Sequence, residues 1–434
     1  MKKKDSVGLD WPGKNKSIEL NKFKQIEEMQ IVYPYTYKDD SVPAGEILPL
    51  ANSPTHGRLI KGLNLEVMQN LLNTGYREKF DLIYLDPPYF SASNYQSKLK
   101  VGSKDNLQII NRQVFMDSWK SLDEYLDYIF SIVQLSKELL SNQGSLFVHL
   151  DWHACHYVKI LLDEVFSRDN LINEIIWCYG GGSNTKRHFQ KKHDTIFWYA
   201  KSSEYIFNPQ YRPYTEKTKE RGLTKVKGPK YVLNEQGALM QDWWTDINKI
   251  LSPTAYENLK FPTQKPLALL ERIINTASNQ DSLVGDFFIG SGTMAEAAEM
   301  LNRNWIGCDN SPIAIQTTHY RLLNYNAKAY QIEWLDPPDY ESLNIEVIFK
   351  LDNDSLIISL KGAGELLNSV IAFWEVGIYE KDIFTSLLQV VRPYSNFPEL
   401  PDQVVIKDIT NTLKNIAVKV YDFRGNTLMK KQPL

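Results

Sequence analysis

The sequence predicts an α/β fold with a mostly parallel sheet and helices on both faces. Short apolar runs, which are typical of buried strands, alternate with amphipathic stretches of helical period. Residues 82–85 and 145–150 are two such strands, and residues 121–140 form the predicted helix between them. Strands joined through helices of this length usually pair in parallel. A strand, a glycine-rich turn and a helix near residue 290 repeat the same unit.

Three parts are expected along the 434 residues. Residues 1–52 are mixed and polar, and they predict an irregular N-terminal arm. Residues 53–325 carry the strand–helix alternation and predict the main domain. Residues 326–434 contain three apolar runs that are typical of strands, so a small β-rich C-terminal domain is expected there. This last part shows no catalytic pattern.

Local sequence patterns in the main domain predict two helices and one long loop. Ser121 and Glu124 form a capping-box pattern at the start of the helix over 121–140, and a further helix is expected over 153–166. Residues 90–114 are polar and lack periodicity. A long polar loop of this kind predicts a mobile cover over the residues just before it.

Composition limits the class of protein. The net charge is −3, so positive charge for a nucleic acid would have to be local. The three cysteines, Cys155, Cys178 and Cys308, are scattered and form no disulfide framework. No apolar stretch follows the N-terminus and no run has the length of a membrane span. We therefore expect a cytoplasmic protein without a membrane partner.

The string Asp86-Pro87-Pro88-Tyr89 is the most informative motif, because it follows a buried strand directly. The two prolines lack N–H groups and end the strand in a rigid, carbonyl-rich turn. This turn offers hydrogen-bond acceptors beside one aromatic ring. A planar group with an exocyclic NH2, such as a base extruded from a nucleic-acid stack, fits that arrangement.

The chain also contains a second Asp-Pro-Pro string at residues 336–338. No buried strand leads into it, and Asp339 stands where the aromatic ring of the first motif is found. We interpret this second copy as an ordinary turn.

A glycine-rich turn forms the second candidate half-site. A strand over 282–288 is followed by Gly290-Ser291-Gly292-Thr293 and a helix, a unit that presents backbone N–H groups to a ligand. Asp309 ends the next strand, where an acid can accept hydrogen bonds from ribose hydroxyls. A nucleoside-containing cofactor is therefore expected.

The same glycines also fit a dinucleotide pattern, so an NAD-dependent oxidoreductase is the alternative. Asp286 argues against it, since a carboxylate just before the turn suits a cationic amine better than a pyrophosphate. Hydride transfer also leaves the Asp86 turn unexplained.

A metal site is not expected. His149, His153, Cys155 and His156 lie close together in sequence, but the first ends a predicted strand and the others open a helix. Their side chains would therefore point in different directions.

Positive charge gathers between residues 180 and 230, with tyrosines interleaved. Local positive charge with aromatic rings suits contact with phosphates, and a solvated surface is the alternative. The candidate DNA contacts are Lys186, Arg187, Lys191, Lys192, Arg212 and Arg221.

These motifs together resemble the DNA methyltransferases that methylate exocyclic amines, N6 of adenine or N4 of cytosine. The resemblance covers about residues 64–320 and rests on Asp86-Pro87-Pro88-Tyr89, on 261–267, on 286–293 and on 305–309. The catalytic motif precedes the cofactor motif, as in the β arrangement of the family. Phe287 departs from the pattern, because the family has proline there.

The resemblance implies a permuted Rossmann-like methyltransferase sheet over 53–325, with a target-recognition region at 185–247. The strands that end at Asp86 and Asp286 would be adjacent and parallel. The cofactor implied is S-adenosylmethionine, and the partner implied is double-stranded DNA. A restriction enzyme and a second copy of the chain are further candidate partners.

The resemblance also implies roles for single residues. Asp86, Pro87, Pro88 and Tyr89 would be catalytic, with Tyr89 stacked on the flipped base. The cofactor would be held by Lys265, Asp286, Phe288, Gly290, Gly292, Thr293 and Asp309, with Lys265 on its carboxylate. Asp at position 86 favours adenine N6, because cytosine-N4 members more often carry Ser. Cytosine N4, an RNA amine and a non-catalytic cofactor-binding subunit are the alternatives.

Overall fold

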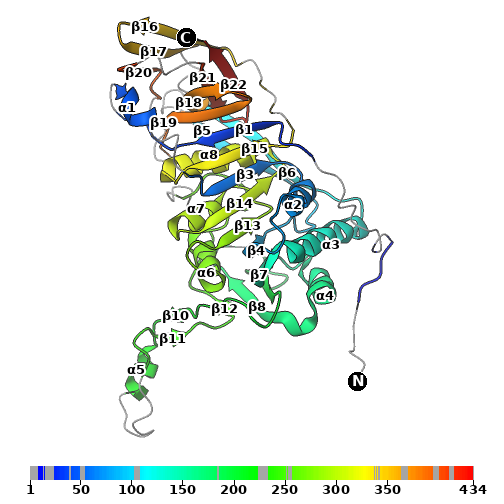
Figure 1. Ribbon diagram of the computed structural model, residues 1–434. Helices are drawn as coiled ribbons and strands as arrows, with labels where there is room; N and C mark the ends of the chain where they lie inside the picture. Colours follow the sequence, from blue (N-terminus) through cyan, green and yellow to red (C-terminus); the bar gives the residue numbers. More distant parts are fainter. Residues whose placement is uncertain are drawn as a thin grey trace.

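The computed structural model describes residues 8–12, 14, 24–38, 41–48, 54–101, 108–182, 185–222, 233–250, 252, 257–336, 338, 340, 343–362, 370–393, 400–409 and 415–433. A long, twisted sheet runs through the whole molecule, with helices packed on two sides of one half (Figure 1).

Fourteen strands of the described residues form this continuous sheet. Their order is β12 (Trp243–Trp244), β8 (Leu171–Cys178), β9 (His193–Ala200), β7 (Leu140–Leu150), β4 (Phe80–Leu85), β13 (Leu283–Asp286), β14 (Asn304–Asp309), β3 (Gly57–Lys61), β15 (Tyr330–Trp334), β1 (Glu28–Val32), β19 (Ile383–Val391), β18 (Ile371–Glu380), β21 (Ile416–Asp422) and β22 (Thr427–Gln432). From β7 to β15 every neighbouring pair is parallel. The predicted mostly parallel sheet is thus confirmed.

Helices cover both faces of this parallel part (Figure 1). The helices α2 (Asn64–Asn73), α3 (Leu122–Leu139) and α4 (Cys155–Phe166) pack on one face, and α6 (Leu267–Ala277), α7 (Thr293–Met300) and α8 (Pro312–Tyr325) pack on the other. The helix expected over 121–140 is confirmed, and its cap is visible, because Ser121 Oγ accepts the Glu124 N–H at 3.2 Å. Its apolar face is buried against the sheet.

The strands that end in the two motifs lie side by side, as expected. β4 and β13 pair in parallel, with Asp286 level with Tyr84. Because these two strands are parallel, both turns leave the sheet at its carboxyl edge, even though the motifs lie far apart in sequence. Ligands of open α/β sheets bind at this edge.

The C-terminal region is β-rich, as predicted, but its strands are shared between two sheets. β18, β19, β21 and β22 extend the main sheet, whereas β16 (Ile345–Asp352), β17 (Ser355–Gly362), β20 (Gln403–Lys407) and the short β2 (Val42–Pro43) form a second sheet. Next to β2 lies the one-turn helix α1 (Ala44–Ile47).

The expectation of an irregular arm over residues 1–52 is wrong at 28–32 and at 42–47. β1 lies inside the main sheet, antiparallel to β15 and parallel to β19. The strand was missed because it is short and carries the polar Gln30, which is fully buried and hydrogen-bonded. β1 is thus the strand that joins the parallel half of the sheet to its C-terminal strands.

In the described part of residues 90–114 the expected polar loop is instead two paired strands, and 102–107 lie outside the described residues. These strands, β5 (Ser93–Val101) and β6 (Gln108–Asp117), pair antiparallel over their length and are called the β5–β6 hairpin. Alternate residues of β5 are buried, among them Leu99 and Val101, while the polar residues between them face out. This period-two pattern is weak in the sequence, because Ser93 and Ser97 occupy two of the inward positions.

The expected recognition region, 185–247, is not one separate insertion. β9 lies within it and pairs with both β7 and β8 inside the main sheet. What projects from the body is the segment with β10 (Tyr211–Arg212), α5 (Glu216–Gly222) and β11 (Ala238–Leu239) (Figure 1). Among the residues that the structure describes, no helix has the length and apolar character of a membrane span.

Gln30→Ala should test the junction at β1. The Gln30 side chain donates to Glu375 at 2.7 Å and accepts from Tyr421 at 3.1 Å, all of them buried. Its removal leaves buried polar groups short of a partner, so the free energy of unfolding should fall by about 1–3 kcal/mol. Chemical denaturation measures this loss. Gln331→Ala, at a partly exposed position of the neighbouring β15, is the control and should cost less than about 0.5 kcal/mol.

Candidate active site

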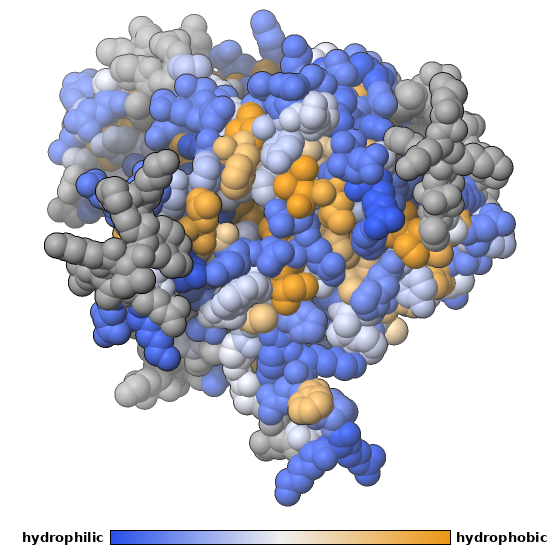
Figure 2. Space-filling view, turned by 90° about the horizontal axis from the view of Figure 1, so that it is seen from below, coloured by the Kyte–Doolittle hydropathy of each residue, from blue (hydrophilic) through white to orange (hydrophobic). Residues whose placement is uncertain are grey.

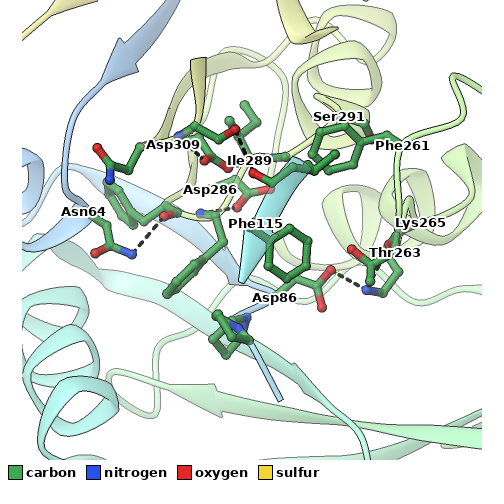
Figure 3. A pocket seen from close by; sticks show the side chains of 18 of the residues that line it. Asn64, Asp86, Phe115, Phe261, Thr263, Lys265, Asp286, Ile289, Ser291 and Asp309 are labelled. Atoms are coloured by element: carbon green, nitrogen blue, oxygen red, sulfur yellow. Dashed lines mark hydrogen bonds and ion pairs between the residues drawn. The ribbon is translucent and has the colours of Figure 1, made fainter. Parts of the chain in front are cut away.

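A cavity of about 270 Å³ opens at the carboxyl edge of β4 and β13 (Figure 3). The residues that line it come from both motif turns, from the start of α2 and from the β5–β6 hairpin. The predicted site residues in its lining are Asp86, Pro87, Pro88, Tyr89, Lys265, Asp286, Phe288, Gly290, Thr293 and Asp309. Gly292 lies within the glycine turn but is not part of the lining. One cavity thus brings together two motifs separated by two hundred residues of chain.

Asp86 has a polar partner on each carboxylate oxygen. Its Oδ1 accepts the Tyr89 hydroxyl at 2.5 Å, and its Oδ2 forms an ion pair with Lys265 (Figure 3). Lys265 Nζ also lies 3.0 Å from the Tyr89 hydroxyl. Burial raises the pKa of Tyr89 well above its ordinary value, so this hydroxyl stays protonated and donates. Asp86, Tyr89 and Lys265 therefore form a closed triangle.

Lys265, which was expected to meet a cofactor carboxylate, has Asp86 as its acidic partner in this structure. Its ammonium group points to Asp86, while its backbone carbonyl accepts the Thr293 hydroxyl at 3.1 Å. The residue therefore connects the catalytic turn to the glycine turn. The expectation rested on charge alone, and charge does not specify which carboxylate a lysine meets.

Two carboxylates, the buried Asp286 and the half-buried Asp309, face the other end of the cavity. Asp286 accepts the Phe288 N–H at 2.9 Å, and burial raises its pKa well above the ordinary range. Asp309 accepts from the N–H groups of Gly290 at 3.0 Å and Ser311 at 2.8 Å, and burial still raises its pKa to about 6. A pKa raised by burial means that the ionised carboxylate is destabilised there. A cation or hydroxyl donors from a ligand would stabilise this ionised form. These two acids therefore fit the amine and the ribose of S-adenosylmethionine.

The glycine turn needs both of its glycines. Gly290 has a φ of +51° and Gly292 a φ of +76°, in the left-handed region. A Cβ on Gly292 would lie 2.7 Å from a side-chain carbon of Thr318. Thr318 in turn donates to the Gly290 carbonyl at 3.1 Å. Thr318, which lies in α8, thus both packs against the glycine turn and forms a hydrogen bond with it.

Phe287, which departs from the family pattern, is buried rather than aimed at a ligand. Its ring packs against Phe80 with centroids 5.9 Å apart. Where a proline would stiffen the backbone, this chain fixes the turn through core packing.

Sequence reasoning missed several residues that support the site. Asp117 at the end of β6 is fully buried and accepts from the backbone N–H groups of Tyr89 at 3.1 Å and Ser91 at 2.7 Å. Asn64 donates to the Phe287 carbonyl at 3.3 Å (Figure 3). The only signal for Asp117 in the sequence was an acid that follows an apolar run, Val114-Phe115-Met116, shortly before a helix.

The histidine cluster separates as its secondary structure suggested. His149 is buried and bonded to Tyr84 and Asp194, whereas His153 pairs with Asp151 at 2.8 Å. Among the described residues, no group of three or more His, Cys, Asp or Glu side chains could hold a metal ion.

The second Asp-Pro-Pro string lies away from the cavity. Asp336 is half-exposed and forms an ion pair with Lys24 at 2.7 Å. Pro337 and Asp339 lie outside the described residues. Asp336 is not part of the cavity lining, in agreement with its interpretation as a turn.

The predicted DNA-contact residues lie outside the cavity and in two places. The loop between β8 and β9 carries four of them. Three are exposed and Lys192 is half-buried; the exposed ones are Lys186, Arg187 and Lys191. Phe189, in the same loop, is 97% exposed. Seen from the β8–β12 end, the surface is mostly hydrophilic, with hydrophobic side chains near its centre (Figure 2).

The other two predicted contacts belong to the projecting segment. Arg212 donates to Gln241 at 2.8 Å, and Arg221 lies in α5, its side chain outside the described part of the structure. Lys225, Lys227, Lys230 and Tyr231 also lie outside the described residues.

The comparison with known families agrees with this geometry. A family model described as DNA methylase, for N6 and N4 methyltransferases, matches residues 80–319. The chain belongs to this DNA methylase family. Its members take the methyl group from S-adenosylmethionine.

Individual relatives span most of the chain. This DNA methylase is 27% identical over 377 residues to the type II methyltransferase M.EcaI of Enterobacter cloacae, covering 73% of this chain and 77% of that protein. It is 28% identical to the DNA adenine methyltransferase YhdJ of Escherichia coli strain K12, covering 54% and 72% of the two chains. Among solved structures, the cytosine-N4-specific PvuII DNA methyltransferase aligns with a TM-score of 0.42 and 19% identity, over 62% of this chain and 87% of that one.

Gly292→Ala should damage both the fold and the cofactor pocket. An added Cβ meets Thr318 and also strains a left-handed backbone, so the free energy of unfolding should fall by about 2–5 kcal/mol. Gly75→Ala is the matched control, because Gly75 also has a positive φ, +94°, but open space around it. It should cost only about 1–2 kcal/mol and leave the affinity for S-adenosylmethionine unchanged. Equal losses in both variants would contradict the role given to Thr318.

Proposed function

We propose that this DNA methylase transfers a methyl group to N6 of adenine in double-stranded DNA, with the target nucleotide flipped out of the duplex. The observation that carries the proposal is the shared cavity. Asp86 and its turn stand at one end, and two carboxylates with raised pKa values, which suit a nucleoside cofactor, stand at the other. A base held at Asp86 would face the cofactor directly.

The Asp86 turn would bind the amine of the flipped base. Each carboxylate oxygen has two acceptor positions, so Asp86 can accept from an NH2 group while it keeps Tyr89 and Lys265. The Pro87 carbonyl would accept the second amine hydrogen. Acceptors on both hydrogens shift electron density onto a poorly nucleophilic nitrogen. Tyr89 would stack on the base and hold it in line for attack.

The other end of the cavity would hold the cofactor. S-adenosylmethionine supplies a methyl group on a positively charged sulfur. Asp286 would meet its amine and Asp309 its ribose hydroxyls, while Phe288, Gly290 and Thr293 shape the wall. Lys265, which is already paired with Asp86, would orient that carboxylate rather than bind the cofactor.

Adenine is proposed over cytosine for two reasons. Asp86 occupies the position where cytosine-N4 members of the family more often carry Ser. The relative YhdJ is named a DNA adenine methyltransferase. Cytosine N4 is the second candidate, because the same acceptors would bind its amine equally well.

The first test identifies the modified base. The protein is incubated with S-adenosylmethionine and unmethylated genomic DNA, and the nucleosides from the digested DNA are identified by mass spectrometry. We expect N6-methyladenine from the wild type, and at least about 100-fold less from Asp86→Ala, since the amine loses its main acceptor. Binding of S-adenosylmethionine by Asp86→Ala, measured by calorimetry, is the folding control.

Each result of this test has a definite meaning. N4-methylcytosine would keep the mechanism and replace the substrate. No methylated base in DNA, together with intact cofactor binding and methylation of RNA, would overturn the choice of DNA. Full activity of Asp86→Ala would remove the proposed role of the turn.

The basic loop between β8 and β9 should contribute to DNA affinity through phosphates. The double variant Lys186→Ala/Lys191→Ala should weaken DNA binding at low salt and reduce the slope of log affinity against log salt by about one for each phosphate that is no longer neutralised. Binding of S-adenosylmethionine should not change. Lys350→Ala/Lys361→Ala removes two exposed lysines from β16 and β17 and is the matched control. Loss of cofactor binding in the loop variant would contradict the assignment.

A further inference from the structure

We propose that His149 is a positioning residue for methyl transfer, which holds the ring of Tyr89 and connects it to the base of the β8–β9 loop. The proposal rests on the function proposed above, in which Tyr89 stacks on the flipped base. His149 lies in β7, next to β4, and is fully buried. It does not line the cavity and so acts through Tyr89.

The imidazole lies against the Tyr89 ring. The two ring centroids are 6.3 Å apart and the planes are inclined by 21°, an offset stack. A ring that must stack on a base needs a fixed tilt, and its own partner on one face sets that tilt. His149 supplies this partner from within the sheet.

Both nitrogens of His149 are occupied by hydrogen bonds. Nδ1 lies 2.9 Å from the Tyr84 hydroxyl, and Nε2 lies 3.2 Å from Asp194 Oδ2. Burial lowers the pKa of His149 and raises that of Tyr84, so the imidazole is neutral and the phenol keeps its proton. Tyr84 therefore donates to Nδ1, and the Nε2–H donates to Asp194. Two bonds of fixed direction hold the plane of the ring.

Asp194 connects this support to the loop that carries Lys186 and Lys191. Its other oxygen accepts the Tyr179 hydroxyl at 2.7 Å, and the Tyr179 N–H donates to the Lys192 carbonyl at 3.0 Å. Tyr179 and Asp194 stand at the two ends of the β8–β9 loop. Lys249 Nζ lies 3.7 Å from the same carboxylate. Contact of the loop with DNA is therefore coupled to the orientation of Tyr89 through three hydrogen-bonded side chains.

The chain contains a matched control for this arrangement. His319 in α8 is also buried, with Nδ1 2.6 Å from the Tyr330 hydroxyl and Nε2 3.1 Å from Glu375. It has the same pattern of partners but does not line the cavity or contact Tyr89. A variant of His319 thus removes an equivalent buried network without touching the site.

The experiment compares His149→Gln with His319→Gln in the full chain. Single-turnover methyl transfer to genomic DNA is followed with radiolabelled S-adenosylmethionine, alongside cofactor affinity and thermal unfolding. His149→Gln should slow the transfer step by about 10- to 100-fold, since small misplacements of a positioning group have effects of this size. Its cofactor affinity should stay within about twofold. His319→Gln should lose comparable stability and keep the wild-type transfer rate.

Two results would overturn the proposal. One is a transfer rate for His149→Gln within about twofold of the wild type. The other is an equal loss of rate in both histidine variants, which would show a purely structural role. If His149→Gln fails to fold, Tyr84→Phe and Tyr330→Phe form the second pair. Each removes one hydroxyl and keeps the ring, and only Tyr84→Phe should slow transfer.

Failure of this proposal is distinct from failure of the proposed function. The comparison is made with a wild type that methylates DNA, so an inactive wild type would count against the function and not against His149. A wild type that methylates DNA, with an unimpaired His149→Gln, would count only against the positioning role of His149.

Discussion

The parallel pairing of β4 with β13 is the constraint on which the site depends. In this register Asp286 lies level with Tyr84, so Asp86 leaves the sheet only two residues further on. The prolines that follow Asp86 prevent β4 from continuing. After the neighbouring strand, β13, the backbone turns at Gly290 and leads into α7. Two acidic turns that are remote in sequence are thereby held on neighbouring strands. The cavity between them exists because neither strand can extend into it.

Charge divides this cavity into two unlike ends. Asp86 has a cation, Lys265, as its direct partner, and the Tyr89 hydroxyl on its other oxygen. Asp286 and Asp309 are held by backbone N–H groups, and burial leaves their pKa values raised. The first end is suited to a neutral amine that needs acceptors, whereas the second favours a ligand with positive charge and hydroxyl groups. The proposed assignment of base and cofactor to the two ends rests on this difference.

Segments outside the parallel part of the sheet hold the cavity lining in place through hydrogen bonds. The β5–β6 hairpin covers the cavity, and Ser311 beside Asp309 donates to the Val114 carbonyl of that hairpin at 3.0 Å. Asp117 at the end of the hairpin holds the backbone after Tyr89. The C-terminal strands reach the same hairpin, since Arg112 donates to the Phe423 carbonyl at 3.5 Å. The C-terminal region thus has a structural connection to the cover of the site, through a sheet that β1 makes continuous.

The sequence by itself determined the local features, those that depend only on residues close to one another along the chain. The strand before Asp86, the cap at Ser121, the glycine turn and the acid at 309 each depend on residues within a few positions, and all were predicted. Tertiary structure alone decided the partners that come from distant parts of the chain. β1 was missed because its polar Gln30 is satisfied only by strands from the far end of the sequence. The ion pair of Lys265 with Asp86 was not foreseen either, because the two residues lie 179 positions apart in the chain. The His149–Asp194 support of Tyr89 exists only because β9 pairs antiparallel with β7, a pairing that no local pattern specifies.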